Sequence, residues 1–204
     1  MLLYYITDRV QFPGDEASRR RTLLEKIAEA ARCGVDFIQL REKDLSGREL
    51  EALARDAVRA VRENLSRTRL LINSRSDLAM ACGADGVHLR STDVGPSEAR
   101  AAWPHGKPVI SVSCHSPADV ARAVVDAADL ALFAPVFEKQ GSSGAGLSAL
   151  RAACEHPIKV LALGGVTLEN ACACGEAGAA GVAGIRLFQD WDVVRVVEAL
   201  QHGA

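Results

Sequence analysis

Three side chains that can donate hydrogen bonds to an anion alternate along one short stretch of the chain. In Asp36-Phe37-Ile38-Gln39-Leu40-Arg41-Glu42-Lys43, an apolar run of strand length ends in three consecutive charges. Successive side chains of a strand point to opposite faces, so we expect Gln39, Arg41 and Lys43 to share one face. Buried cations need partners, and three donors at one strand end suit an anionic substrate. The less favoured alternative is a structural ion pair between Arg41 and a core carboxylate.

Two glycine-bearing turns near the C-terminus predict a phosphate site. They are Leu163-Gly164-Gly165-Val166-Thr167 and Val182-Ala183-Gly184-Ile185-Arg186, and each ends a strand-like run. Glycine permits close approach of the backbone to a ligand, and backbone N–H groups at a helix N-terminus bind phosphate. The alternative is that these glycines only turn the chain. Because there are two such turns, we expect a phosphate to be bound at Gly164, Gly165, Ile185 and Arg186.

Further strand-like runs also end in polar side chains. The amide of Asn73 could hydrogen-bond a heterocycle or a phosphate, and Ser113 stands two residues before His115. Histidine titrates near neutrality and can transfer protons, so His115 is a candidate general base or acid. Its alternative role is to cap a helix or bond a loop carbonyl. For His88, in Gly86-Val87-His88-Leu89, a structural role is favoured.

Composition excludes several classes of function. The 204 residues suit one domain with a substantial core, which we place at residues 1–204. A formal net charge of -2 gives no electrostatic basis for binding nucleic acid or an anionic membrane. Neither a membrane span nor a secretory signal is evident, and the six cysteines are interpreted as reduced core residues. We therefore expect a cytoplasmic protein.

The elements that must position these side chains alternate regularly between strand and helix. Helices are expected over 18–33 and 46–65, and continuous apolar runs predict strands buried on both faces. The expected strands are 2–7, 36–41, 69–73, 86–89, 108–113, 130–134, 158–164 and 181–185. Eight such units predict a single α/β domain with the (β/α)8 TIM-barrel fold, whose strand ends carry the active site. The rival, a doubly wound open sheet, lacks its usual glycine-rich first turn, since Thr7-Asp8-Arg9 stands there.

Together these residues resemble the thiamine-phosphate synthase and thiazole tautomerase family. The resemblance spans nearly the whole chain. It is carried by Tyr5-Ile6-Thr7-Asp8, Gln39-Leu40-Arg41-Glu42-Lys43, Ile72-Asn73-Ser74-Arg75-Ser76-Asp77, Gly83-Ala84-Asp85-Gly86-Val87-His88-Leu89, Ser113-Cys114-His115-Ser116, Ala134-Pro135-Val136-Phe137 and Ala162-Leu163-Gly164-Gly165-Val166. The order and spacing of these motifs are specific to the family, and they do not separate its two activities.

The resemblance implies different chemistry for the two branches. The synthase joins a pyrimidine diphosphate to a thiazole phosphate with the help of Mg²⁺, held near an Asn-Asp pair and a second aspartate. Here Ser74 follows Asn73, so Asp93 is the one matching carboxylate, and the stretch after Phe137 departs from the synthase pattern. The tautomerase aromatises a thiazole carboxylate phosphate without a metal and has a histidine where His115 stands.

We therefore expect a tautomerase, an isomerase with no cofactor, in which His115 transfers the proton. Arg41 and Lys43 would contact the substrate carboxylate, with Gln39, Asn73 and Ser113 around the ring. The first alternative is a thiamine-phosphate synthase using Mg²⁺ at Asp93. The second is a non-catalytic protein that binds thiazole or thiamine phosphates. In each case the partner is a small molecule, with no nucleic acid or membrane, and a homodimer is possible.

Overall fold

Eight parallel strands close into a barrel, which confirms the fold prediction. The computed structural model describes residues 1–64, 66–138 and 143–202. The strands pair in chain order and the last pairs with the first, so each strand hydrogen-bonds two neighbours. They are β1 (Leu2–Ile6), β2 (Phe37–Leu40), β3 (Arg69–Asn73), β4 (Gly86–Leu89), β5 (Val109–Cys114), β6 (Leu130–Phe133), β7 (Lys159–Ala162) and β8 (Gly181–Gly184). This is the architecture of the TIM barrel.

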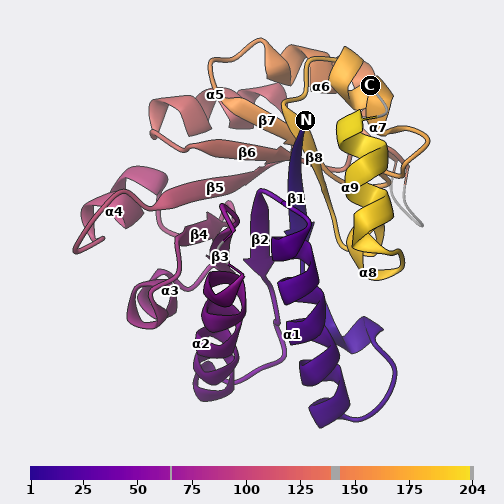
Figure 1. Ribbon diagram of the computed structural model, residues 1–204. Coiled ribbons are helices and arrows are strands. Elements are labelled where there is room, and N and C mark those ends of the chain that lie inside the picture. Colours follow the sequence, from indigo (N-terminus) through magenta and orange to yellow (C-terminus); the bar gives the residue numbers. More distant parts are fainter. Residues whose placement is uncertain (65, 139–142, 203–204) are drawn as a thin grey trace.

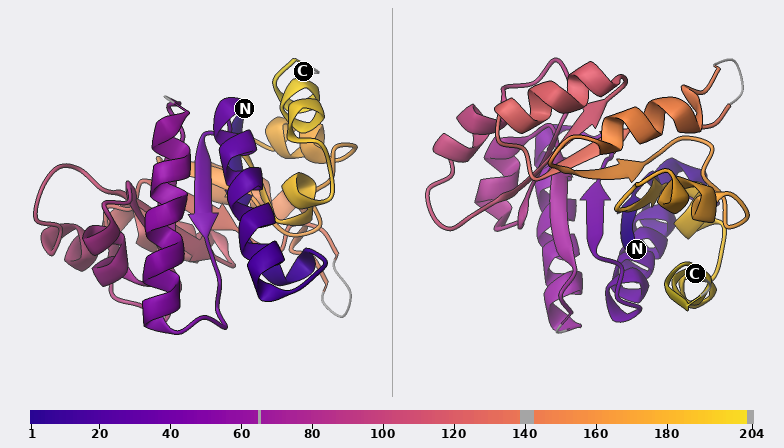
Figure 2. Two further views of the ribbon diagram at one scale, coloured as in Figure 1. Left: turned by 60° about the horizontal axis from the view of Figure 1, so that its bottom comes forward. Right: turned by 90° about the horizontal axis from the view of Figure 1, so that it is seen from above.

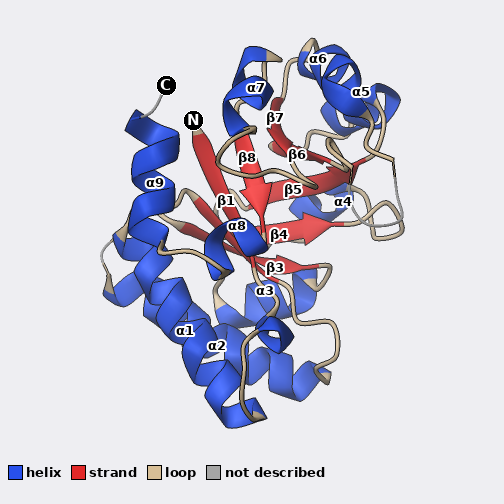
Figure 3. Ribbon diagram, turned by 90° about the vertical axis from the view of Figure 1, so that its right-hand side faces the viewer, coloured by secondary structure: helices blue, strands red, loops and turns tan. Residues whose placement is uncertain are grey.

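Helices follow the strands and cover the outside of the barrel (Figures 1 and 3). They are α1 (Glu16–Arg32), α2 (Gly47–Glu63), α3 (Ser76–Cys82), α4 (Pro96–Ala101), α5 (Pro117–Val125), α6 (Gly146–Cys154), α7 (Ala171–Glu176), α8 (Arg186–Gln189) and α9 (Val193–His202), with a 3-10 turn, η1, at Arg9–Gln11. The long helices α1 and α2 lie side by side, and α9 stands next to α1, with Val193 N donating to Glu29 (Figures 2 and 3). No helix among the residues described has the length and apolar character needed to cross a bilayer.

Local sequence explains where the helices begin. The side chain of Asp15 accepts a hydrogen bond from Ser18 N, so α1 begins two residues before the expected Ser18. Ser46 and Glu49 form a capping box at the start of α2. Ser116 caps α5, whose first residue is Pro117, as the sequence predicts. Several strands, such as β1, β2 and β7, end one or two residues earlier than expected. Beyond these ends the chain turns into a loop and no longer pairs with the neighbouring strands.

The core has two parts that follow from the two-residue repeat of the strands. Inside the barrel, Tyr4, Leu132 and Leu161 are among the buried apolar side chains. Outside it, the opposite faces of the strands pack under the helices. The inward side chains of β3, β4 and β5 are polar toward the carboxyl end, and the register aligns Asn73 with His88. The barrel therefore carries its apolar filling on one side and a polar wall on the other.

Candidate active site at the carboxyl ends of the strands

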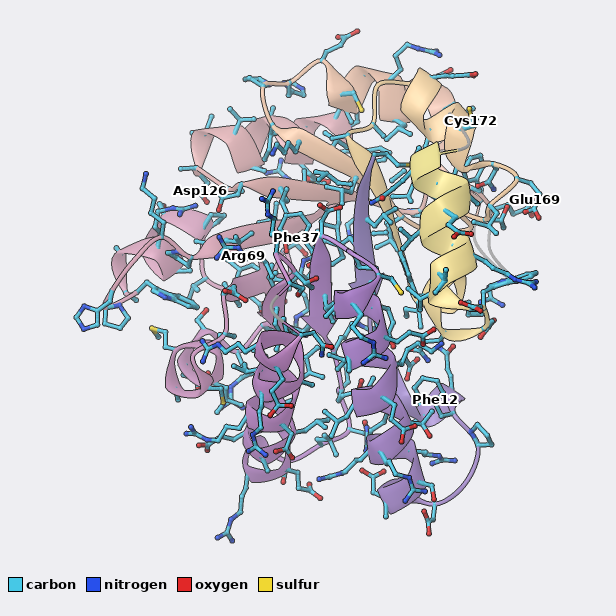
Figure 4. All side chains as sticks on the ribbon, viewed as in Figure 1. Phe12, Phe37, Arg69, Asp126, Glu169 and Cys172 are labelled. Carbon is cyan, nitrogen blue, oxygen red and sulfur yellow. The ribbon has the colours of Figure 1, made fainter. Side chains whose placement is uncertain are left out.

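A cavity of about 330 Å³ opens at the carboxyl ends of the strands and brings distant polar residues together. In Figure 4, Phe37 and Arg69, the first residues of β2 and β3, lie apart from Phe12 and Glu169, which lie in loops after β1 and β7. The cavity is lined by Ile6, Gln39, Arg41, Lys43, Asn73, His88, Arg90, Ser91, Thr92, Ser113, His115, Leu132 and Leu163. All six residues that the sequence predicts to bind the substrate away from its phosphate or to transfer its proton line this cavity, namely Gln39, Arg41, Lys43, Asn73, Ser113 and His115.

Gln39 and Asn73 form one polar unit at the floor of this cavity. Gln39 Nε2 donates to Asn73 Oδ1 at 2.8 Å, and Asn73 Nδ2 donates to Ser74 Oγ at 3.1 Å. Gln39 is 1% exposed, and its Oε1 has no hydrogen-bond partner among the described residues. A buried amide oxygen without a partner is costly. Gln39 Oε1 is therefore left as an acceptor for a group that can donate a hydrogen bond.

His88 is buried in a chain of hydroxyl groups. Its Nδ1 lies 2.9 Å from Ser111 Oγ, its Nε2 lies 2.9 Å from Ser113 Oγ, and Ser111 also bonds the hydroxyl of Tyr4. Burial lowers the pKa of His88 to about 4, and Arg41 and Arg90 oppose its protonation further. His88 is therefore neutral at pH 7, and it fixes the position of Ser113 at the cavity wall.

His115 stands at the rim of the cavity and is exposed. Its Nδ1 lies 2.7 Å from the carbonyl oxygen of Ala134, and its backbone N–H donates to Asp119. Because a carbonyl accepts, Nδ1 carries the proton, and Nε2 is the atom left for a ligand.

Arg41 and Lys43 reach the cavity because Glu42 is anchored on the opposite side. Glu42 is 5% exposed and accepts hydrogen bonds from Thr7 Oγ1, Arg9 N and Arg9 Nη1. Thr7 Oγ1 in turn accepts from the backbone N–H of Arg41 at 2.9 Å. No carboxylate within the described ranges forms a salt bridge with Arg41 or Lys43. Both cations are thus left without a bonded carboxylate among the described residues.

The four residues expected to bind phosphate line a second cavity, of about 360 Å³. Gly164, Gly165, Ile185 and Arg186 all contribute, and Leu163 lines both cavities, so the two adjoin. Gly164 has φ +91°, and a Cβ added there would come within 2.7 Å of Pro135 Cα. In α8, Phe188 N and Gln189 N donate to Ile185 O, whereas the N–H groups of Arg186 and Leu187 have no acceptor among the described residues. Glycine is therefore required at the wall of this cavity.

Arg90 is a cavity residue that sequence reasoning missed. Its signal was a charge immediately after the β4 run, where Leu89-Arg90 repeats the pattern seen at Leu40-Arg41. The expected metal ligand of the synthase alternative, Asp93, is bound to it: Arg90 N and Nη2 donate to the Asp93 carboxylate, each at 2.8 Å. Burial raises the pKa of Asp93, but bonds from Arg90 and Ser74 outweigh it and the net direction is down.

This donor set does not fit a magnesium centre. Mg²⁺ is usually held by one or two carboxylates together with substrate phosphates. Asp93 is absent from the cavity wall and lines a neighbouring hollow of about 200 Å³, and both its oxygens already bond Arg90. In the parts of the chain that the structure describes, no group of three or more His, Cys, Asp or Glu could hold a metal ion. Lys139, in the stretch after Phe137 that departs from the synthase pattern, lies outside the described residues.

Comparisons with known proteins identify the family of the chain. The family model described as thiamine monophosphate synthase matches residues 3–188. The chain belongs to this family. A thiamine-phosphate synthase of Methanoculleus marisnigri is 38% identical over 207 residues, covering 98% of this chain and 93% of its own. A protein of Geobacter sulfurreducens is 42% identical over 186 residues, covering 89% of this chain and 83% of its own.

The solved structures agree with this assignment. A thiamine phosphate pyrophosphorylase from Pyrococcus furiosus superimposes with a TM-score of 0.83 and 29% identity, covering 98% of this chain and 94% of its own. These relatives favour the synthase family activity, so the expected tautomerase and its isomerase class were wrong. The error has a local cause: Ser74, His115 and the stretch after Phe137 were given more weight than motifs along the whole chain. Differences at a few loop positions are weaker evidence for the activity of a chain than motifs that match the family over its whole length.

Proposed function

We propose that this protein is a thiamine-phosphate synthase, a transferase that joins a pyrimidine diphosphate to a thiazole phosphate. The C–O bond between the pyrimidine methylene carbon and the diphosphate breaks, and the bonding electron pair leaves with the diphosphate. The lone pair of the thiazole ring nitrogen forms the new C–N bond to that carbon. Supporting this proposal are relatives with this activity in their names and a site with room for two anionic substrates.

The observation that carries the proposal is the pair of adjoining cavities at one end of the barrel. One is lined by Arg41 and Lys43, and the other is formed by two glycine turns and Arg186. A diphosphate suits the first, because clustered cations stabilise the charge that develops on a leaving group. A monophosphate suits the second, because backbone N–H groups and one guanidinium match its smaller charge. The shared wall at Leu163 would bring the two reacting atoms together.

The remaining polar residues have binding roles in this proposal. Gln39 and Asn73 orient the pyrimidine ring, with the unpartnered Gln39 Oε1 accepting from a ring substituent. Ser113, positioned by His88, adds a hydroxyl to the same wall. No proton is transferred in forming the C–N bond, so His115 acts here as a binding residue at the rim. The family resemblance implies Mg²⁺, but this donor set does not accommodate a metal centre, and the roles above do not involve one.

Direct product formation tests the proposal. The protein is incubated with hydroxymethylpyrimidine diphosphate and the thiazole phosphate, and thiamine phosphate and pyrophosphate are quantified by chromatography and mass spectrometry. We expect equal amounts of the two products, and both should fall by the same factor in Arg41→Gln when the diphosphate substrate is limiting. Tight binding of both substrates without product would instead favour the non-catalytic binder. We also propose a cytoplasmic location and a homodimer. Sedimentation, which measures the mass of the protein in solution, tests the homodimer.

A further inference from the structure

Arg90 brings a third cation into a cavity that already holds two. It follows β4, it lines the cavity with Arg41 and Lys43, and its side chain is 52% exposed. Among the described residues that line this cavity there is no carboxylate. Arg41 and Lys43 form no salt bridge among the described residues, and Arg90 is bonded to Asp93 alone, so the cations facing this hollow outnumber their acidic partners and favour a bound anion.

The three cations are close enough to influence one another. Arg41 is the main cause of a lowered pKa at Lys43, with burial second and Arg90 third. Repulsion of this kind favours a ligand that carries several negative charges in a small volume. A diphosphate has that property, whereas a single carboxylate has one charge. The charge of the cavity therefore matches the larger anion of the proposed reaction.

Asp93 holds Arg90 by one edge of its guanidinium. The carboxylate accepts from Arg90 N, Nε and Nη2. Arg90 Nη1 has no hydrogen-bond partner in the part of the chain that the structure describes. A guanidinium has five N–H groups in a fixed fork, so the edge bearing Nη1 can bind a phosphate oxygen while the other edge stays bound to Asp93. Asp93 lines the neighbouring hollow, and its bonds to Arg90 restrict the direction in which the edge bearing Nη1 can point.

We propose that Arg90, with Arg41 and Lys43, supplies the positive charge that binds the diphosphate group, in place of a metal ion, and that Asp93 positions Arg90 rather than binding a metal. This inference rests on the proposed function, because it assigns the diphosphate substrate to this cavity. It differs from the implied use of Mg²⁺ in predicting that diphosphate affinity persists without a divalent cation. It also assigns a loss of pyrophosphate affinity to substitution of Arg90 and little change in affinity to substitution of Asp93.

Calorimetric titration of inorganic pyrophosphate tests the inference without turnover. The protein is titrated in EDTA and again in excess Mg²⁺, as wild type and as Arg90→Gln, Asp93→Asn and the control Arg75→Gln. Arg75 is an exposed arginine at the same end of the barrel, is bonded to Asp77, and lies outside the cavity wall. Thermal unfolding of each variant shows that it is folded.

We expect wild-type affinity in EDTA to lie within about threefold of that in Mg²⁺, because the cations are already in place. Arg90→Gln should weaken pyrophosphate binding in EDTA by about tenfold or more, and Arg75→Gln should not. Asp93→Asn should change affinity by less than about threefold in either buffer, since the amide oxygen still bonds Arg90.

Three results would overturn the inference: pyrophosphate binding that needs Mg²⁺, loss of a Mg²⁺-dependent gain in Asp93→Asn, or an Arg90→Gln variant that binds as wild type does. These results are separate from the test of the proposed function. A protein that makes thiamine phosphate but needs Mg²⁺ to bind pyrophosphate contradicts this inference alone. A protein that binds pyrophosphate through Arg90 in EDTA but makes no thiamine phosphate contradicts the proposed function alone.

Discussion

Arg9 and Glu42 form a buried ion pair beyond the ends of β1 and β2, outside the wall of the cation-lined cavity. Arg9 Nη1 lies 3.1 Å from Glu42 Oε2, and the two side chains are 3% and 1% exposed. Glu42 also accepts from Thr7, which in turn accepts from the backbone of Arg41. The pair therefore joins the end of β1 to the end of β2 and holds the strand end that carries Arg41 and Lys43.

Replacing Glu42 should weaken both the fold and the diphosphate site. In Glu42→Gln, the amide nitrogen faces the donors of Thr7 and Arg9, so we expect unfolding to become easier by about 1–3 kcal/mol. A looser Arg41 should raise KM for the diphosphate substrate about three- to tenfold. Urea unfolding and steady-state kinetics measure the two effects. The matched control is Glu51→Gln, which removes an exposed ion pair with Arg55 and should cost less than about 1 kcal/mol.

Alanine substitutions at Gly164 and Gly106 distinguish the cost of backbone strain from the cost of a steric clash. Both have positive φ, +91° and +79°, but an added Cβ would strike Pro135 at Gly164 and would meet nothing within 4 Å at Gly106. Gly106→Ala should therefore cost only about 1–2 kcal/mol of backbone strain. Gly164→Ala should cost more and should raise KM for the thiazole phosphate. Equal destabilisation of the two variants, with unchanged KM in both, would show that the wall at Gly164 is not needed for binding.

Arg41→Gln and Arg186→Gln should affect different substrates. Arg41 lines the first cavity and Arg186 the second. Loss of one charged donor should raise KM for the substrate bound there by about tenfold. We expect Arg41→Gln to act on the diphosphate substrate and Arg186→Gln on the thiazole phosphate, each with little effect on the other. Initial rates with one substrate varied at a time measure this. An equal rise of both KM values in either variant would contradict the assignment of the cavities.

Buried His88 should make stability depend on pH. Its pKa is lowered to about 4 in the folded protein, chiefly by burial, and is near 6.5 when unfolded. A lowered pKa contributes stability above the unfolded value, and this stability is lost as pH falls through the folded value. The loss between pH 6.5 and 4 should reach about 3 kcal/mol at most. Urea unfolding of wild type at pH 7 and pH 4.5, compared with His88→Asn, isolates the contribution.

The control for His88 is His105→Asn, at an exposed loop position. It should keep the wild-type dependence of unfolding free energy on pH, whereas His88→Asn should flatten it. If His88→Asn and wild type lost the same stability between pH 7 and pH 4.5, proton uptake by His88 would not be the cause.

His115→Asn distinguishes binding from proton transfer. A general base contributes about 10²–10⁴-fold to a rate. A rim residue that only contacts substrate should cost less than about tenfold in kcat/KM, since one hydrogen bond is lost. We expect the smaller effect, measured as thiamine phosphate formation at saturating and limiting substrate. A fall in kcat above a hundredfold with KM unchanged would return His115 to a chemical role.

The fold and much of the site could be predicted because both follow from short-range pattern. Continuous apolar runs at regular intervals indicated eight buried strands, and the two-residue repeat of a strand places Gln39, Arg41 and Lys43 on one side. Glycine at 164 and 165 reflected a backbone with positive φ, which few other residues adopt. These properties depend on a residue and its near neighbours, so the linear order of residues determined them.

The tertiary structure decided which charges meet. Closing the barrel brings Arg90 into the same cavity as Arg41, buries Arg9 against Glu42 across 33 positions, and bonds Asp93 to Arg90 outside the cavity wall. The partner of a charged side chain depends on loop path and on strands distant in sequence, and no local repeat encodes either. For that reason the linear sequence determined the barrel and the polar strand ends, while only the closed barrel decided which cations share a cavity and which carboxylate is already paired.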